Sequence, residues 1–289
     1  MKFIFIMLFV CLIPFSNLAF AMQEKSSANS KGIDVSHYEG EVDWEKVKSS
    51  GVDFAYTKAT EGNTIIDQYL KRNVEQARDN NILIGAFHTA RPTSPFNPSE
   101  AVSQASFFAS TLYNEVGDYG DIMPVLDLEF NSGLTASELA QWTRIFLDTT
   151  KKITHKEVIL YTGIWFLQEN GNLKNQFSDV PLWISYYKDN TPPDIAGWNR
   201  WLIWQYTDKG SMEGVGSNTD LNVGPTSLDA LKGVPSESNH STGMTSFGLL
   251  VCFMIGFLLL FKRTRFNNKV TTHSNQNLSV FSSNGRTKI

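Results

Sequence analysis

The sequence contains only two cysteines, and neither lies in the middle of the chain. Cys11 and Cys252 both sit inside apolar runs near the ends. No disulfide framework can therefore stabilise the middle of the chain, so its core must hold itself together by burial. The same absence excludes a Cys-ligated zinc site and a catalytic cysteine from the main domain.

Short motifs that bind nucleotides or metals are also missing. The chain has no Walker motif, no dinucleotide-binding glycine motif and no H-E-x-x-H. The adjacent Ser36 and His37 do not form the G-x-S-x-G nucleophile elbow of the hydrolases that use a serine. We therefore predict neither a cofactor nor a metal site.

Positive charge is concentrated in the C-terminal tail, beyond residue 261. The charged residues there are all basic: Lys262, Arg263, Arg265, Lys269, Arg286 and Lys288. Since the whole chain has a net charge of −4, the main body is more acidic than that value suggests. An acidic main body argues against a nucleic-acid partner.

The first apolar run has the features of a secretory signal peptide. Lys2 precedes an apolar stretch at 3–14, and Ala19-Phe20-Ala21 supplies an A-x-A cleavage site. We predict that residues 1–21 are a signal peptide cleaved after Ala21, with an uncleaved anchor as the alternative. Residues 22–31 are polar and are expected to form a linker.

The second apolar run, at 247–261, is uncharged and is followed directly by basic residues. With the two residues before it, the run reaches the lower bound of the ~17–25 residues that span a membrane. The basic cluster fits the positive-inside rule and predicts an extracytoplasmic main domain anchored to the membrane. We expect a linker at 234–244, a transmembrane helix at 245–261 and a basic, disordered tail at 262–289.

Between these ends, strand-like and helix-like stretches alternate. Strands are predicted at 32–37, 54–59, 82–89, 123–130, 158–162, 182–186, 202–206 and 219–222, and helices at 43–50, 67–80, 98–116 and from Thr135 onwards. Repeated βα units indicate an α/β fold with a parallel sheet, and about eight strands favour a closed barrel. Because full helices are missing after residue 162, we predict that residues 32–233 form an irregular TIM-like β/α barrel and, in this ectodomain, a monomer.

The stretch 123–130 carries two acids in an otherwise apolar strand. Asp127 and Glu129 are two residues apart, so a strand presents both on the same face. Burial of two carboxylates is costly unless a site uses them. Crowding should separate their pKa values and leave one protonated and one ionised near neutral pH. Acid-catalysed cleavage of a glycosidic bond requires that state.

Two further acids lie on the strands that would close the barrel. Asp34 is on the first strand and Asp220 on the last, so they should be neighbours that face Asp127 and Glu129 across the mouth. We take these four as the catalytic candidates. Structural alternatives remain open, because Asp34 could cap a loop and Asp220 could form an Asx turn with Asn222.

Aromatic residues recur in the same strands or at their ends. A cleft lined by aromatic faces and acids suits a polysaccharide, although about half of such residues are expected to be core. Lys58, at the end of the strand predicted at 54–59, could also form an ion pair with Glu61 at the rim of the cleft. The aromatic candidates are Tyr56, Phe87, Trp183, Tyr186, Trp204 and Tyr206.

Together these residues resemble a known family. The motifs, in chain order, are Asp34-Val35-Ser36, Lys58-Ala59-Thr60-Glu61-Gly62, Gly85-Ala86-Phe87-His88 with Ala90-Arg91-Pro92, Asp127-Leu128-Glu129, Leu182-Trp183 with Tyr186, Trp204-Gln205-Tyr206-Thr207 and Asp220-Leu221-Asn222. This ordered set resembles glycoside hydrolase family 25, the Chalaropsis-type lysozymes or N-acetylmuramidases. The resemblance covers about residues 32–232 and adds His88, Arg91 and Gln205 to the substrate-binding candidates.

The resemblance implies an irregular β/α barrel that cleaves the β-1,4 bond between N-acetylmuramic acid and N-acetylglucosamine in peptidoglycan. By motif, Glu129 is similar to the family's general acid. Asp127 is similar to its partner, which orients the substrate's acetamido group or stabilises developing charge. Asp34 and Asp220 are similar to the other acids of the site. Either an enzyme carboxylate or the substrate's own N-acetyl group could act in the second step.

Two positions depart from the family's pattern. Glu39 stands where glutamine is common, and Thr89 follows His88 where an aromatic residue is frequent, which indicates an altered rim. One alternative is a non-catalytic glycan-binding protein on the same barrel. Another is a chitinase-type barrel with a D-x-D-x-E strand, but Val125 occupies the first acidic position of that motif.

Overall fold

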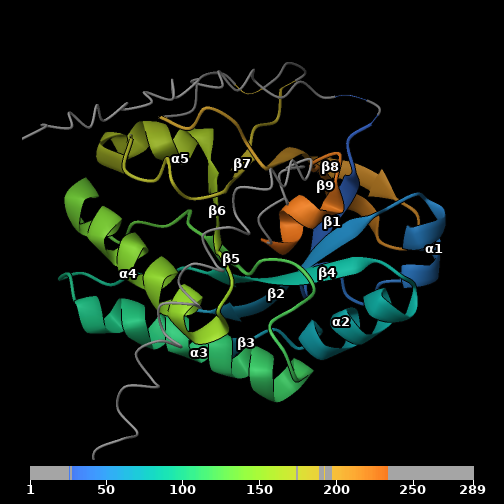
Figure 1. The fold of residues 1–289 in the computed structure, drawn as a ribbon, viewed down its shortest axis with the longest axis horizontal. Coiled ribbons are helices and arrows are strands. Elements are labelled where there is room, and N and C mark those ends of the chain that lie inside the picture. Colours follow the sequence, from blue (N-terminus) through green and yellow to red (C-terminus); the bar gives the residue numbers. More distant parts are fainter. Residues whose placement is uncertain (1–25, 27, 174, 189–191, 193–196, 234–289) are drawn as a thin grey trace, which may run out of the picture. The chain divides into compact units, whose positions relative to one another are not determined.

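The computed structural model describes residues 26, 28–173, 175–188, 192 and 197–233 (Figure 1). Within these residues no helix is both long enough and apolar enough to cross a membrane. The predicted signal peptide at 1–21, the predicted span at 245–261 and the basic tail lie outside the described residues.

Eight strands of the described chain form a closed barrel. They are β1 (Lys31–Val35), β2 (Phe54–Glu61), β4 (Leu83–Thr89), β5 (Val125–Asp127), β6 (Ile159–Gly163), β7 (Leu182–Ser185), β8 (Ile203–Met212) and β9 (Gly216–Val223). The barrel closes because β1 pairs with both β2 and β9. A short β3 (Ile65–Ile66) folds back on the end of β2. The predicted closed barrel is confirmed.

One feature of the sheet differs from the prediction of a parallel barrel. Strands β1 to β8, apart from β3, are parallel to their neighbours, but β9 is antiparallel to both β8 and β1. The connection between Met212 and Gly216 is a tight hairpin, and a parallel crossover needs a dozen or more residues. The last strand therefore enters the barrel in the reverse direction.

Helices surround the first half of the barrel and thin out in the second (Figure 1). Four helices follow the early strands: the six-residue α1 (Trp44–Ser49), α2 (Leu70–Asp79), and the 19-residue α3 (Pro98–Val116) and α4 (Ala136–Thr154). After β6 there are only short helical turns in the described chain: α5 (Ile164–Glu169), η1 (Gly171–Leu173) and η2 (Leu228–Lys232). This asymmetry confirms the predicted irregularity.

The helix boundaries follow the capping signals, with one exception. Asp43 caps α1, and Thr135 forms a capping box with Glu138 at α4, both as predicted. Helix α2 begins three residues later than the predicted start at Asp67. The Asp67 carboxylate instead accepts hydrogen bonds from the backbone N–H groups of His37 and Tyr69, so it anchors a loop.

The fold also begins slightly earlier than the predicted linker boundary. β1 starts at Lys31, and the two residues before it are already buried. The Asn29 side chain donates to the Gly224 carbonyl at 2.7 Å, which ties this segment to the residue after β9.

Side chains alternate between the two faces of the barrel wall. The inward positions form one apolar cluster: Phe54, Tyr56, Ile122, Met123, Val125, Ile159, Trp183, Ile203 and Leu231. The outward positions pack against the helices in a separate, larger cluster. Inward glycines leave room for the aromatic rings, because a Cβ on Gly85 would overlap the Tyr56 ring and lie 2.8 Å from Ile122 Cγ1.

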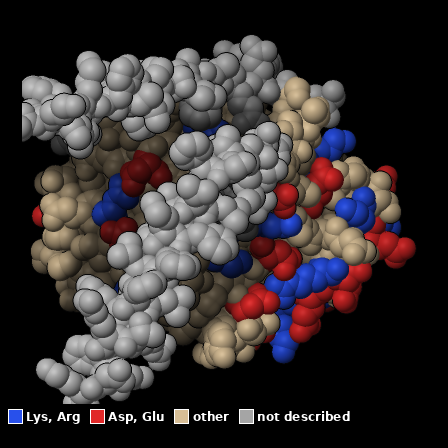
Figure 2. Space-filling model, viewed as in Figure 1, with Lys and Arg blue, Asp and Glu red and all other residues tan. Residues whose placement is uncertain are grey.

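The surface carries charges of both signs. Figure 2 shows Lys and Arg side chains intermingled with Asp and Glu over the side of the molecule where α1 and α2 lie. Arg78 of α2 pairs with Asp118 and Asp121, and Arg72 pairs with Glu41. Such exposed pairs contribute little to stability individually, so the fold depends on its two apolar clusters.

We expect Gly85→Ala to lower the free energy of unfolding by about 1–3 kcal/mol, because the added methyl group overpacks the barrel interior against Tyr56. Gly171→Ala is the matched control, since a Cβ there meets no atom within 4 Å. Urea unfolding followed by tryptophan fluorescence measures both. Equal stability of the two variants would contradict this account of the interior.

Candidate active site

A cavity of about 310 Å³ opens at the end of the barrel where the parallel strands finish. Its size falls in the usual range for a ligand site. Its acids are Asp34, Glu39, Glu61, Asp127, Glu129 and Asp220, and its cations are Lys58 and Arg91. Its aromatic lining consists of Tyr38, Phe87, Tyr161 and Trp183. All four catalytic candidates from the sequence meet in this pocket.

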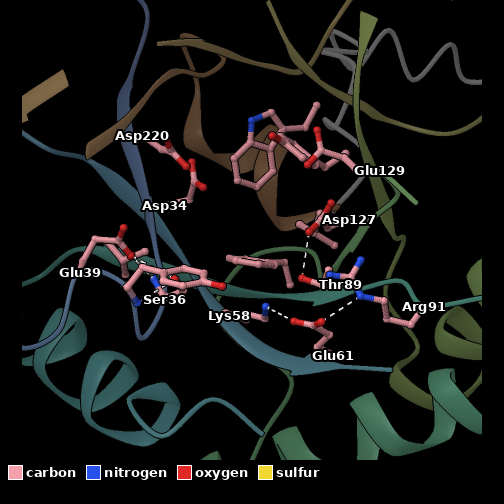
Figure 3. Close-up of a pocket in the computed structure, with 16 residues that line it drawn as sticks. Asp34, Ser36, Glu39, Lys58, Glu61, Thr89, Arg91, Asp127, Glu129 and Asp220 are labelled. Carbon is pink, nitrogen blue, oxygen red and sulfur yellow. Dashed lines mark hydrogen bonds and ion pairs between the residues drawn. The ribbon is translucent and has the colours of Figure 1, made fainter. Parts of the chain in front are cut away.

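Asp34 and Asp220 lie together on one side of the pocket (Figure 3). They are register partners in the β1–β9 pair, which confirms that they are neighbours, although Asp220 arrives on an antiparallel strand. Burial raises the pKa of Asp34 and also raises the pKa of Asp220, to about 9, with the charge of Asp34 adding to the second shift. Asp220 therefore holds a proton that it shares with Asp34 in a hydrogen bond.

Asp127 and Glu129 lie on the opposite side (Figure 3). Strand β5 ends at Asp127, earlier than the predicted 130, yet the extended path continues past it. Leu128 N–H donates to the Tyr161 carbonyl at 2.9 Å, and the Leu128 carbonyl accepts from Thr162 Oγ1 at 2.8 Å. Leu128 is thereby turned into the outer core, and both acids face the cavity as predicted.

The two acids of this pair have separated pKa values. Burial raises the pKa of Glu129 to about 8, and the negative charges of Asp127 and Asp34 add to the shift. Burial raises the pKa of Asp127 only to about 6, because Thr89 Oγ1 donates to its Oδ2 at 2.9 Å and favours the ionised form. At neutral pH Glu129 is protonated beside an ionised Asp127.

The cations form a chain along a third side of the pocket (Figure 3). Glu61 accepts from Lys58 Nζ at 2.5 Å and from Arg91 Nε at 2.9 Å. Burial raises the pKa of Glu61, but the two cations outweigh it and leave that pKa lowered. The Arg91 guanidinium also lies over the Phe130 ring, 5.0 Å from its centroid. Phe130 directly follows the protonated acid, so this pair shapes the adjacent rim.

Five of the predicted substrate-binding residues line the pocket, and they are Lys58, Glu61, Phe87, Arg91 and Trp183. The other five, namely Tyr56, His88, Tyr186, Trp204 and Gln205, do not line it. Strand alternation explains most of the difference, because adjacent residues of one strand face opposite sides of the barrel wall.

His88 and Trp204 are on the outer side. His88 follows the inward Phe87 and is fully buried among the helices, with Thr60 Oγ1 at 2.7 Å from its Nδ1 and Gln104 Oε1 at 2.9 Å from its Nε2. Burial lowers the pKa of His88 to about 4, so it is neutral. Trp204 donates its indole N–H to the Tyr186 carbonyl at 2.8 Å, and both rings join the outer core.

Tyr56 and Gln205 face inward but lie beneath the pocket. The Tyr56 ring packs against Trp183 with centroids 4.9 Å apart, so it supports the floor. Gln205 is buried and donates to the carboxylate of Asp34. Both residues act through the side chains above them.

Sequence reasoning missed Tyr161 and Tyr38 and treated Thr89 only as a change at the rim. Tyr161 is the register partner of Asp127 on β6, so strand pairing could have revealed it. Thr89 occupies the same register position on β4, where its hydroxyl holds Asp127. Tyr38 is 80% exposed in a loop after β1, and no periodic pattern marks such a position.

The chain matches known proteins over most of the barrel. The family model described as "Glycosyl hydrolases family 25" matches residues 33–215. "Lysozyme M1" of Streptomyces globisporus is 34% identical over 199 residues, which make up 66% of this chain and 66% of that protein.

Solved structures agree with the family match. The spore cortex lytic enzyme SleM of Clostridium perfringens is 35% identical with a TM-score of 0.68, over 73% of this chain and 71% of that chain. A bacterial lysozyme from Streptomyces coelicolor is 30% identical with a TM-score of 0.63, over 71% of this chain and 96% of that chain. This chain belongs to family 25 of the glycosyl hydrolases.

Proposed function

We propose that the chain is a peptidoglycan hydrolase that cleaves the β-1,4 bond between N-acetylmuramic acid and N-acetylglucosamine. The observation that carries the proposal is the protonated Glu129 beside the ionised Asp127, in a cavity that also holds Asp34 and Asp220. The names of the relatives, among them lysozymes and an N,O-diacetylmuramidase of Chalaropsis, support the same substrate.

We propose the following first step. Glu129 donates its proton to the glycosidic oxygen of the leaving sugar while the bond from that oxygen to the anomeric carbon breaks, through a transition state with positive charge on the sugar ring. The ionised Asp127 stabilises that charge from one side of the pocket, and the Asp34 carboxylate faces it from the other. The partly exposed Phe87 provides a face on which the sugar can lie, and the buried Trp183 forms the floor beneath it. Water finally bonds to the anomeric carbon and gives up a proton that restores the acid form of Glu129.

Two competing functions are less well supported. A non-catalytic binding protein has no need of a proton donor with a raised pKa, yet Glu129 has one. In a chitinase-type motif an acid would stand at Val125, and here that residue lines the cavity with an apolar side chain. The pocket lacks the extra carboxylate of a D-x-D-x-E strand.

We further propose that the enzyme acts outside the cytoplasm while anchored to a membrane. Support comes from the sequence alone: the signal-peptide pattern at 1–21, the apolar run at 247–261 and the basic residues that follow it. The polar linker at 234–244 would let the barrel reach its polymeric substrate.

Glu129→Gln should lower kcat on purified peptidoglycan by about 100-fold or more, because the amide cannot donate the required proton. Release of reducing ends measures the rate, and mass spectrometry of the products should show muramic acid at the reducing end. Glu157→Gln, an exposed acid remote from the pocket, should keep full activity. Wild-type rates in Glu129→Gln would reject the assignment of the donor, and glucosamine reducing ends would reject the assigned bond.

The pH profile should be bell-shaped, with highest kcat/KM between about 6 and 8. Activity falls as pH rises through the pKa of Glu129, because the donor loses its proton. It falls again as pH drops through the pKa of Asp127, because the stabilising charge is lost. Asp127→Asn removes a charge that raises the pKa of Glu129, so the alkaline limb should move to lower pH. An unmoved alkaline limb contradicts the proposed coupling.

Full-length protein should sediment with membranes and resist extraction by alkaline carbonate, whereas a chain ending after residue 233 should be released in soluble form. The apolar run at 245–261 supplies the expected difference. Protease added outside intact cells should degrade the barrel if it faces outward. Carbonate-extractable full-length protein would refute the anchor.

A further inference from the structure

We propose that Gln205 and Asn222 are positioning residues that hold Asp34 as a charged carboxylate opposite Glu129, and that Tyr161, Tyr187 and Trp183 set the direction of the two amides. This inference rests on the proposed hydrolysis. It identifies the acid that carries the charge opposite Glu129 and the residues that hold that acid in place.

Asp34 is surrounded by amide donors. Gln205 Nε2 lies 3.2 Å from Oδ1 and 3.0 Å from Oδ2 of Asp34, and Asn222 Nδ2 lies 2.7 Å from Oδ2. Both amides are buried, and Asp34 itself is only 9% exposed. The two amides therefore take over the role of water around this carboxylate, and hydrogen bonds to a charged acceptor are the stronger kind.

The direction of the Asn222 amide is fixed by Trp183. An indole N–H can only donate, so the oxygen of the amide must face it. Trp183 Nε1 lies 2.9 Å from Asn222 Oδ1, which leaves Nδ2 to point at Asp34. The same Trp183 ring forms part of the pocket floor, so the floor and the carboxylate are coupled through one amide.

The direction of the Gln205 amide is fixed by two phenols. Its Oε1 accepts from Tyr161 at 2.9 Å and from Tyr187 at 2.6 Å. Burial raises the pKa of both phenols, so both keep the protons that they donate. A reversed amide would place its oxygen against the Asp34 carboxylate, where two acceptors would repel each other.

The proton in this part of the pocket belongs to Asp220. Burial raises the pKa of Asp34, but both amides donate to its carboxylate and oppose that shift. Burial and the charge of Asp34 raise the pKa of Asp220 to about 9, so Asp220 is the acid that keeps the proton. Glu39, whose Oε2 accepts from Ser36 N–H at 2.7 Å, adds negative charge near both residues. The other titratable or charged groups facing Asp34 are Asp127, Glu129, Tyr161, Tyr187 and Lys58.

Holding Asp34 in its charged form should stabilise the transition state more than it strengthens substrate binding. A fixed negative charge facing the sugar stabilises the positive charge that develops as the bond breaks, and the ground state lacks that charge. Loss of the amide donors should therefore lower kcat with little change in KM. It should also make Asp34 easier to protonate, and because the charges of both Asp127 and Asp34 are needed, the acid limb of the pH profile should move to higher pH.

Gln205→Met removes the donors at similar length, and we expect a loss of kcat of about 10- to 100-fold with KM within about twofold of wild type. Tyr187→Phe removes a single hydroxyl from a ring that is 48% exposed, while Tyr161 still holds the amide. It should lower kcat by about 2- to 10-fold. Tyr113→Phe, on an exposed ring of α3 away from the pocket, is the matched control and should equal wild type.

All variants are assayed as full chains on purified peptidoglycan across pH, with thermal unfolding to establish that each is folded. An acid limb shifted to higher pH in Gln205→Met and Tyr187→Phe supports the inference. Wild-type kcat and pH profile in folded Gln205→Met overturn it. If Gln205→Met does not fold, the same result in Tyr187→Phe overturns it. A wild-type enzyme that releases no reducing ends from peptidoglycan would instead refute the proposed function.

Discussion

The protonation pattern of the site follows from the electrostatic cost of placing several carboxylates close together at one end of a closed barrel. Charged carboxylates removed from water repel each other, and the structure relieves that repulsion by keeping protons on some of them. On one side Asp220 is protonated and Asp34 is held by amides. On the other, Glu129 is protonated and Asp127 is held by Thr89. Each pair thus combines one acid with one charged base.

The two pairs differ in what surrounds them, and this difference separates their roles. Glu129 has no hydrogen-bond donor holding its charged form among the described residues, so its proton is available to a substrate. The proton of Asp220 is already engaged with Asp34. Lys58 and Arg91 are neutralised in part by Glu61, which prevents the cations from cancelling the raised pKa of Glu129. Proton donation is therefore directed to one side of the cavity.

Much of this was predictable from sequence because strands and helices leave periodic signals. The four acids, the closed barrel and the capped helices α1 and α4 follow from local pattern and from spacing. It was harder to predict which residues of a strand face the barrel interior. The motifs group adjacent residues, such as Phe87 with His88 and Trp204 with Gln205, and do not separate the inward side chain from the outward one. Register alone reveals Tyr161 opposite Asp127. The reversed direction of β9 depends on a hairpin whose residues carry little apolar periodicity.

The antiparallel β9 has a consequence for how the enzyme is made. Asp34 is separated by 171 residues from Gln205 and by 188 residues from Asn222, and both partners lie on the β8–β9 hairpin at the end of the barrel sequence. During synthesis, Asp34 on the first strand can therefore form its hydrogen bonds to Gln205 and Asn222 only after nearly the whole domain has been made. A chain interrupted before this hairpin contains Glu129 and Asp127 but lacks the amides that hold Asp34. The carboxylate that faces Glu129 is thus held only when the end of the barrel sequence is present, which suits an enzyme whose substrate is a load-bearing cell wall.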